Sequence, residues 1–107
     1  MPQMPNRDRE TLDEEFMDIL GNENVYFQPP ENVRMSYPAI VYHLSNFNDR
    51  HADDQTYISI RSYDVTLIDK RPDSPLIDDI KNRFAYCRYV RHQTIDNLNH
   101  EYFTIYY

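Results

Sequence analysis

Glycine occurs once in this 107-residue sequence, as Gly21. Loops that cradle nucleotide phosphates need several closely spaced glycines, so P-loop and Rossmann-type nucleotide sites are excluded. Cysteine also occurs once, as Cys87, which rules out a disulfide within the chain and favours a reducing, cytoplasmic setting. No apolar run approaches the roughly 20 residues of a membrane span, and the first residues do not form a signal peptide. We therefore expect a protein that is made in a cytoplasm and contacts no membrane.

Tyrosine and acidic residues are what the sequence has in abundance. Ten tyrosines and five phenylalanines accompany a complete lack of tryptophan. Tyrosine suits strands and half-buried surfaces because its apolar ring carries a polar hydroxyl. The net charge of −7 is uneven: residues 1–32 contribute −6, residues 33–80 contribute −3, and residues 81–107 contribute +2. Overall acidity argues against nucleic-acid binding, and opposite charge at the two ends suits head-to-tail contact between copies.

Residues 6–22, NRDRETLDEEFMDILGN, have the apolar periodicity of a helix. The helix either starts with a capping box formed by Thr11 and Glu14 or begins earlier, at Asn6. Gly21 follows the last apolar residue, where it is placed to end the helix in the left-handed conformation. The apolar stripe consists of Leu12, Phe16, Ile19 and Leu20.

A β-hairpin is predicted in the middle of the chain. Residues 24–38 contain a short strand, a Pro-Pro break and a connecting segment. Pro38 then precedes the strand AIVYHLSNF at 39–47, whose apolar residues on both faces are typical of a covered central strand. A polar tip at 48–55 separates it from the long strand TYISIRSYDVTLID at 56–69.

The last part of the chain predicts a second helix followed by two strands. The helix lies within residues 70–84, with Ser74 as its N-cap and Pro75 at its first position. The strands lie at 85–93 and 97–107 and are joined by the turn TIDN. We therefore expect one α+β domain over the whole chain, with a mainly antiparallel sheet of about four strands and two helices packed against it.

Inside the long strand 56–69, the apolar residues switch faces near Arg61 and Ser62. Either a β-bulge resets the register there, or the two halves of the strand pack against different surfaces. In the second case the distal half lacks cover from its own chain, and we expect it to contact a partner protein. The apolar residues concerned are Ile58 and Ile60 before the switch, and Tyr63, Val65 and Leu67 after it.

Metal-type donors are dense around the hairpin tip, at His43, Asp49, His51, Asp53 and Asp54. Zinc sites place three or four converging ligands at close spacing on rigid elements, and that spacing is missing here. Aspartate, asparagine and histidine are also common in turns, because they tolerate unusual backbone angles. We expect an exposed tip that binds no metal.

Catalysis has little support in the sequence. Asp53 and Asp54 are adjacent on an extended segment, so their side chains point to opposite faces. Asp78 and Asp79 suit the positive end of a helix. Cys87 on a strand is typical of a small buried hydrophobe, and no nucleophile motif accompanies any of these residues. We expect neither an enzyme nor a cofactor.

The segment KNRFAYCRYVRH at 81–92 interleaves basic and aromatic residues. Such interleaving is typical of proteins that bind single-stranded nucleic acid. Because the net charge is −7, a contact with an acidic protein surface is favoured, for example the N-terminal helix of a neighbour. The residues predicted to contact another subunit or a partner protein are Phe47, Ile58, Ile60, Arg61, Arg83, Arg88 and Arg91.

The order of these elements resembles that of the tail terminator (tail completion, or head-tail joining) proteins of long-tailed bacteriophages. The segments that carry the resemblance best are VYFQPPENVRMSYPAIVY at 25–42 and DNLNHEYFTIYY at 96–107. In that family a Pro-initiated strand and a long second strand form the main hairpin, a helix opening with Pro, Asp and Ser crosses the sheet, and the last strand closes it. The resemblance covers essentially the whole chain, which is on the short side for the family.

The resemblance implies a structural virion protein of the tail or neck, made in the cytoplasm of a host bacterium. Such proteins form a ring, usually six-fold, that caps the head-proximal end of the tail tube, stops its growth and joins tail to neck. The implied partners are copies of the chain itself, the tail tube protein and a neck or head-completion protein, while DNA passes through the lumen without specific binding. Two alternatives stay open: a head-completion or neck connector protein, and a small monomeric cytoplasmic protein-binding module.

Overall fold

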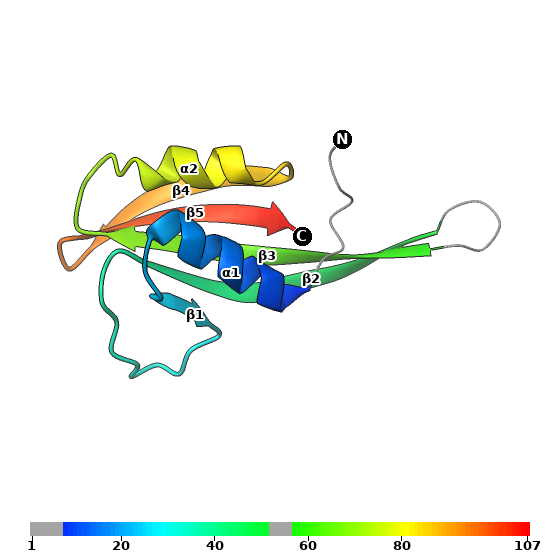
Figure 1. Cartoon of the computed structure of the whole chain (residues 1–107), viewed down its shortest axis with the longest axis horizontal. Helices are drawn as coiled ribbons and strands as arrows, with labels where there is room; N and C mark the ends of the chain where they lie inside the picture. Colours follow the sequence, from blue (N-terminus) through cyan, green and yellow to red (C-terminus); the bar gives the residue numbers. More distant parts are fainter. Residues whose placement is uncertain (1–7, 52–56) are drawn as a thin grey trace.

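The computed structural model describes the backbone of residues 8–51 and 57–107, and their side chains apart from those of 46–51 and 57–60. Within this part of the chain the elements follow the order α1 (Arg9–Leu20), β1 (Val25–Phe27), β2 (Ala39–His51), β3 (Tyr57–Asp69), α2 (Leu76–Arg83), β4 (Cys87–Ile95) and β5 (Leu98–Tyr106). The strands form one sheet in the order β1-β2-β3-β5-β4 (Figure 1). β1 runs parallel to β2, and every other neighbouring pair is antiparallel.

The predicted α+β class is confirmed, and so are the two helices and the central hairpin, which β2 and β3 form. The described sheet has five strands, one more than expected. The additional strand is β1, which pairs in parallel with Ile40–Tyr42 of β2. Its three residues were expected as a short strand, but a run so short does not reveal that it joins the sheet edge. Short edge strands of this kind expose few unpaired backbone groups.

The start of α1 differs from the predicted capping box. The helix begins at Arg9, with Asp8 at the cap position. Thr11 lies inside the first turn, where its backbone N–H donates to the Asp8 carbonyl at 3.1 Å. The pairing of Thr11 with Glu14 as a capping box is therefore wrong, because the helix has already begun. The other predicted start, Asn6, lies outside the described residues.

Two predicted helix termini are confirmed, the end of α1 at Gly21 and the start of α2 at Ser74. Gly21 ends α1 with a left-handed φ of 73°, and its N–H donates to the Met17 carbonyl at 2.9 Å. α2 is assigned from Leu76, but Pro75 before it already has helical angles (φ −63°, ψ −16°). The hydroxyl oxygen of Ser74 accepts the Leu76 N–H at 3.2 Å, which is the hydrogen bond of an N-cap. Ser74 thus caps α2, as its sequence position indicates.

Aromatic side chains form the centre of the core, between the sheet and the two helices that lie on one of its faces (Figure 1). Phe16 of α1 meets Tyr42 and Phe84 edge-on, with ring centroids 5.1 and 5.5 Å apart. Tyr107 is fully buried, and its N–H donates to the Arg61 carbonyl at 3.0 Å. These rings supply the bulk that tryptophan would otherwise provide. The other buried core residues are Leu12, Ile40, Tyr63, Val65, Leu67, Leu76, Ile80, Phe103 and Ile105.

A bulge lies at the level of Arg61 and Ser62, where the apolar residues of β3 switch faces. It is in β2, the strand that pairs with β3. The pairing of β2 with β3 shifts between Leu44 and Asn46, opposite Tyr63 and Ser62. Ser45 is therefore the additional residue. β3 itself pairs without interruption through Arg61 and Ser62, so this bulge does not reset the facing of residues within β3, which the first explanation of the switch requires. The side chains of residues 58 and 60, on which the other explanation depends, lie outside the described part.

Candidate assembly surface

The two faces of the sheet differ in what covers them. α1 and α2 pack on one, the helix face. The other face carries no helix of the described chain, and we call it the open face (Figure 1). One row of neighbouring positions across the open face consists of His43, Asp64, Thr104 and Arg88. The next row consists of Val41, Thr66, Tyr102 and Arg91.

A bulge in β4 explains why two arginines share the open face. In a regular strand, residues three apart point to opposite faces. The register of β4 shifts at Val90, so that Arg88 pairs with residue 104 of β5 and Arg91 pairs with residue 102. Positions 102 and 104 lie on one face of β5, and the two arginines therefore lie together. A β-bulge changes the face of the sheet to which the following side chains point.

The two arginines line a shallow hollow of about 460 Å³ on the open face. The Arg91 guanidinium lies over the Tyr102 ring, 4.4 Å from its centroid, an arrangement that holds a cation against an aromatic surface. Asp64 also lines the hollow, as does His43. Arg88, Arg91, Asp64 and His43 are all exposed. With two arginines against one aspartate, the charge of these lining residues is positive.

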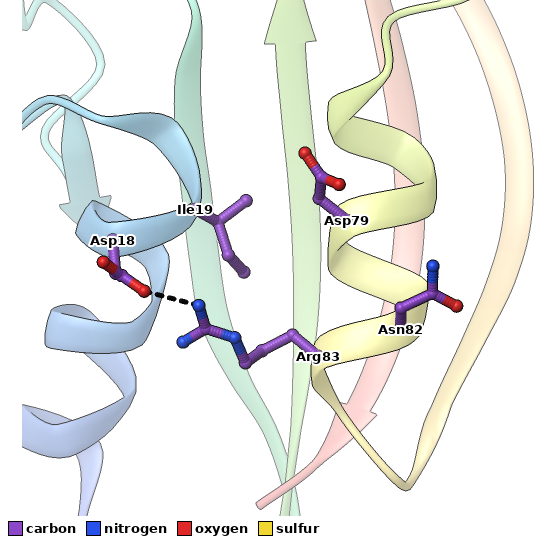
Figure 2. A pocket seen from close by; sticks show the side chains of 5 residues that line it. All are labelled: Asp18, Ile19, Asp79, Asn82 and Arg83. Atoms are coloured by element: carbon purple, nitrogen blue, oxygen red, sulfur yellow. Dashed lines mark hydrogen bonds and ion pairs between the residues drawn. The ribbon is translucent and has the colours of Figure 1, made fainter.

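Arg83 lies apart from the other two arginines. It extends from α2 toward α1, where it forms an ion pair with Asp18 (Figure 2). It also lies 3.7 Å from a carboxylate oxygen of Glu15. The space between the helices is a groove of about 360 Å³, lined by Arg83, Asp18, Asp79, Ile19 and Asn82. Arg83 therefore contacts the acidic N-terminal helix of its own chain.

The same bulge shapes the helix face, where it places Tyr89 and His92 beside Glu101. Glu101 is 3% exposed. Its carboxylate accepts a hydrogen bond from the Tyr89 hydroxyl at 2.7 Å and lies 2.7 Å from His92 Nδ1. Burial, together with the bond to Glu101, raises the pKa of Tyr89 to about 12. Sequence reasoning missed this cluster because unbroken alternation would place Tyr89 and His92 on opposite faces.

His92 also connects this cluster to a hydroxyl group. Its Nε2 lies 3.1 Å from Thr94 Oγ1, so hydroxyl, imidazole and carboxylate follow one another as they do around an activated nucleophile. The carboxylate of Glu101 is shared with Tyr89, however, and all four residues belong to the β4–β5 hairpin. We interpret Tyr89 and His92 as the hydrogen-bond partners that the buried carboxylate of Glu101 requires.

β2 and β3 continue beyond the other strands as a two-stranded extension (Figure 1). β5 pairs with β3 only as far as Ser62, whereas β2 and β3 stay paired out to His51 and Tyr57. We call residues 46–51 and 57–61 the arm. Among the described strands, the backbone of 57–60 has a partner on one side alone. Isolated two-stranded ribbons are marginally stable at best in water.

The remaining predicted site residues are distributed as follows. Arg61 is half-buried at the base of the arm. The arm contains Phe47, Ile58 and Ile60, and their side chains lie outside the described part, as do the tip residues Asp53 and Asp54. The described residues contain no group of three or more His, Cys, Asp or Glu that could hold a metal ion. Burial raises the pKa of the half-buried thiol of Cys87 to about 11, which disfavours the reactive thiolate.

No family model matches the chain, and no curated protein matches it. In the part of the chain that the structure describes, neither helix is both long enough and apolar enough to cross a membrane.

Proposed function

We propose that the protein is a structural subunit of a bacteriophage tail, which assembles with copies of itself into a ring. The ring caps the head-proximal end of the tail tube, stops its growth and joins it to the neck. Its partners are further copies of the chain, the tail tube protein and a neck protein. The proposal takes its identity from the resemblance of the sequence, and the surfaces described above supply its physical support.

The observation that carries the proposal is the arm. Its strands extend past the body of the sheet, and the backbone of 57–60 keeps N–H and C=O groups without a strand partner on the side away from β2 in the described part. Such an edge pairs readily with another chain unless it is covered. A projecting ribbon that needs cover is expected of a subunit that completes its fold by joining its neighbours.

Charge supports a conduit rather than a nucleic-acid-binding protein. The net charge is −7, so phosphates are repelled overall and DNA can pass without being held. We propose no catalytic step and no cofactor. The buried Glu101 is already paired, and Cys87 is held in its protonated form by burial.

The test is to disrupt the gene in the phage that encodes the protein and to examine the lysate by electron microscopy. Without the cap, tail tubes should lack length control and should not join to heads. Restoring the wild-type gene in trans should restore normal tails, which controls for effects on neighbouring genes.

The alternatives give different results in the same experiment. Tails of normal length that accumulate separately from heads would assign the protein to the neck as a connector instead. Normal virions in the absence of the gene product would contradict any role in tail assembly and would favour a small cytoplasmic binding module.

A further inference from the structure

The outer surface of the helix layer is acidic. α1 carries five acidic residues against one arginine, Arg9, and Arg9 is paired within the helix with Asp13 at 3.1 Å. Glu10 and Glu14 are exposed on α1, and Asp79 is exposed on α2. The groove between the helices adds Asp18, whose side chain is 70% exposed although it pairs with Arg83 (Figure 2).

The open face has the opposite character. Arg88 and Arg91 lie in adjacent rows, three residues apart in sequence, because of the bulge at Val90. The structure gives neither arginine an ion pair among the described side chains, and Arg91 rests on Tyr102. The hollow beside them, of about 460 Å³, has room for side chains of another molecule.

These two surfaces lie on opposite sides of the same sheet. A subunit therefore cannot bring its own arginines to its own acidic helix layer, but a second copy can. A contact between two different surfaces of identical chains is heterologous, and it continues from copy to copy until the arrangement closes into a ring. Complementary charge on the two surfaces selects the partner and speeds the encounter.

We propose that the open face of one copy, through Arg88 and Arg91, docks on the acidic helix layer of the next copy, over the groove that contains Asp18 and Asp79. This contact rests on the proposed function and names the surfaces that join the ring. Nucleic acid, which the same arginines would attract, is a different occupant and is treated below as an outcome of the test.

Charge reversal on each surface tests the contact. The first variant is Arg88→Glu with Arg91→Glu. The second is Glu14→Lys with Asp79→Lys, which leaves the Asp18–Arg83 ion pair intact. Each variant should fold, as shown by circular dichroism, and each should lose the assembled species in native mass spectrometry, because like charges then face each other across the contact.

Mixing the two variants gives the decisive result. The open face of the first variant is acidic and can dock on the helix layer of the second variant, which has gained lysines. The unchanged basic open face of the second variant can dock on the unchanged acidic helix layer of the first. Equal amounts should therefore restore assembly, in a species that contains both variants in equal number. Chemical cross-linking should join position 88 or 91 of one variant to α1 or α2 of the other.

Matched controls reverse the same charges elsewhere on the surface. Arg34→Glu with Lys70→Glu controls for the lost arginines, and Glu23→Lys with Glu31→Lys controls for the lost acids. All four residues are exposed in loops. Both control variants should assemble like the wild type, which separates a local contact from an effect of net charge.

Three outcomes would overturn the inference. Assembly of the Arg88/Arg91 variant like the wild type would place the contact elsewhere and leave the ring proposal standing. A mixture of the two charge-reversed variants that stays monomeric, although the wild type assembles, would likewise place the contact elsewhere and leave the ring proposal standing. Unchanged assembly with lost retention of a single-stranded oligonucleotide would identify the open face as a nucleic-acid surface. A wild type that is monomeric would instead count against the proposed function itself.

Discussion

At the residue scale, Asp69 shows how the chain stabilises a buried charge next to a turn. It is 3% exposed. Its carboxylate accepts hydrogen bonds from the guanidinium of Arg71 at 2.8 Å and from the hydroxyl of Ser74 at 2.8 Å. Burial alone would raise the pKa of Asp69, but the hydrogen bonds from Arg71 and Ser74 outweigh it, and the pKa is lowered. The same Ser74 caps α2, so one cluster fixes both the end of β3 and the start of the helix.

Replacing Asp69 with asparagine should destabilise the fold at neutral pH by about 1–3 kcal/mol, the usual cost of disrupting a buried hydrogen-bonded charge. Because the folded-state pKa lies below the unfolded value of about 4, the stabilisation by Asp69 is present above that pH. It is lost as the pH falls through the folded-state pKa. Urea unfolding at a series of pH values should therefore show the difference between wild type and variant shrinking in acid.

Asp73→Asn provides the control for this prediction, because it makes the same charge change at an exposed position. Its effect should be small at every pH. A difference between wild type and the Asp69 variant that persists unchanged in acid would show that shape, rather than the charged hydrogen bonds, is responsible.

At the element scale, the sequence predicts where elements end better than how they face. Gly21 indicates the end of α1 and Ser74 indicates the start of α2, because a single residue determines each of these helix termini. The turn between β4 and β5 is equally local: Asp96 and Asn97 have φ values of 52° and 64°, which such residues tolerate and two-residue hairpins need. The bulge at Val90 has no such signal, because it depends on how β4 pairs with β5. The groupings that it creates on both faces were consequently not predictable.

Deleting Val90 tests the role of this bulge. Without the additional residue, β4 returns to regular alternation, and Tyr89 and His92 can no longer both reach Glu101. The buried carboxylate then loses a partner, at a cost of about 1–3 kcal/mol, measurable by thermal or urea unfolding. The deletion also separates Arg88 from Arg91, so assembly should weaken.

Val90→Thr is the matched control, because it keeps the residue count and a similar shape at an exposed site. It should change stability and assembly little. A deletion variant as stable as the wild type would mean that the sheet can move the bulge to another residue. The Tyr89–Glu101–His92 cluster would then not depend on the additional residue Val90.

At the scale of the whole molecule, apolar periodicity and turn residues predicted the broad architecture, whereas the surfaces depend on the tertiary arrangement. The uneven charge of the sequence indicated head-to-tail contact, but only the sheet shows that the acidic helix layer and the arginine pair face opposite ways. The segment 81–92 looked like one basic unit in the sequence. In the structure it divides, because Arg83 belongs to a helix that packs on α1 whereas Arg88 and Arg91 follow on the far side of the sheet.

The central claim is that copies of this chain assemble with one another through different surfaces into a closed ring. The most direct measurement is the mass of the purified wild-type protein by native mass spectrometry and sedimentation equilibrium over a wide range of concentration. The account predicts one discrete closed species, with six times the mass of the chain for a six-fold ring, that does not grow further as concentration rises. A monomer at every concentration, or a two-fold dimer as the largest species, would contradict it.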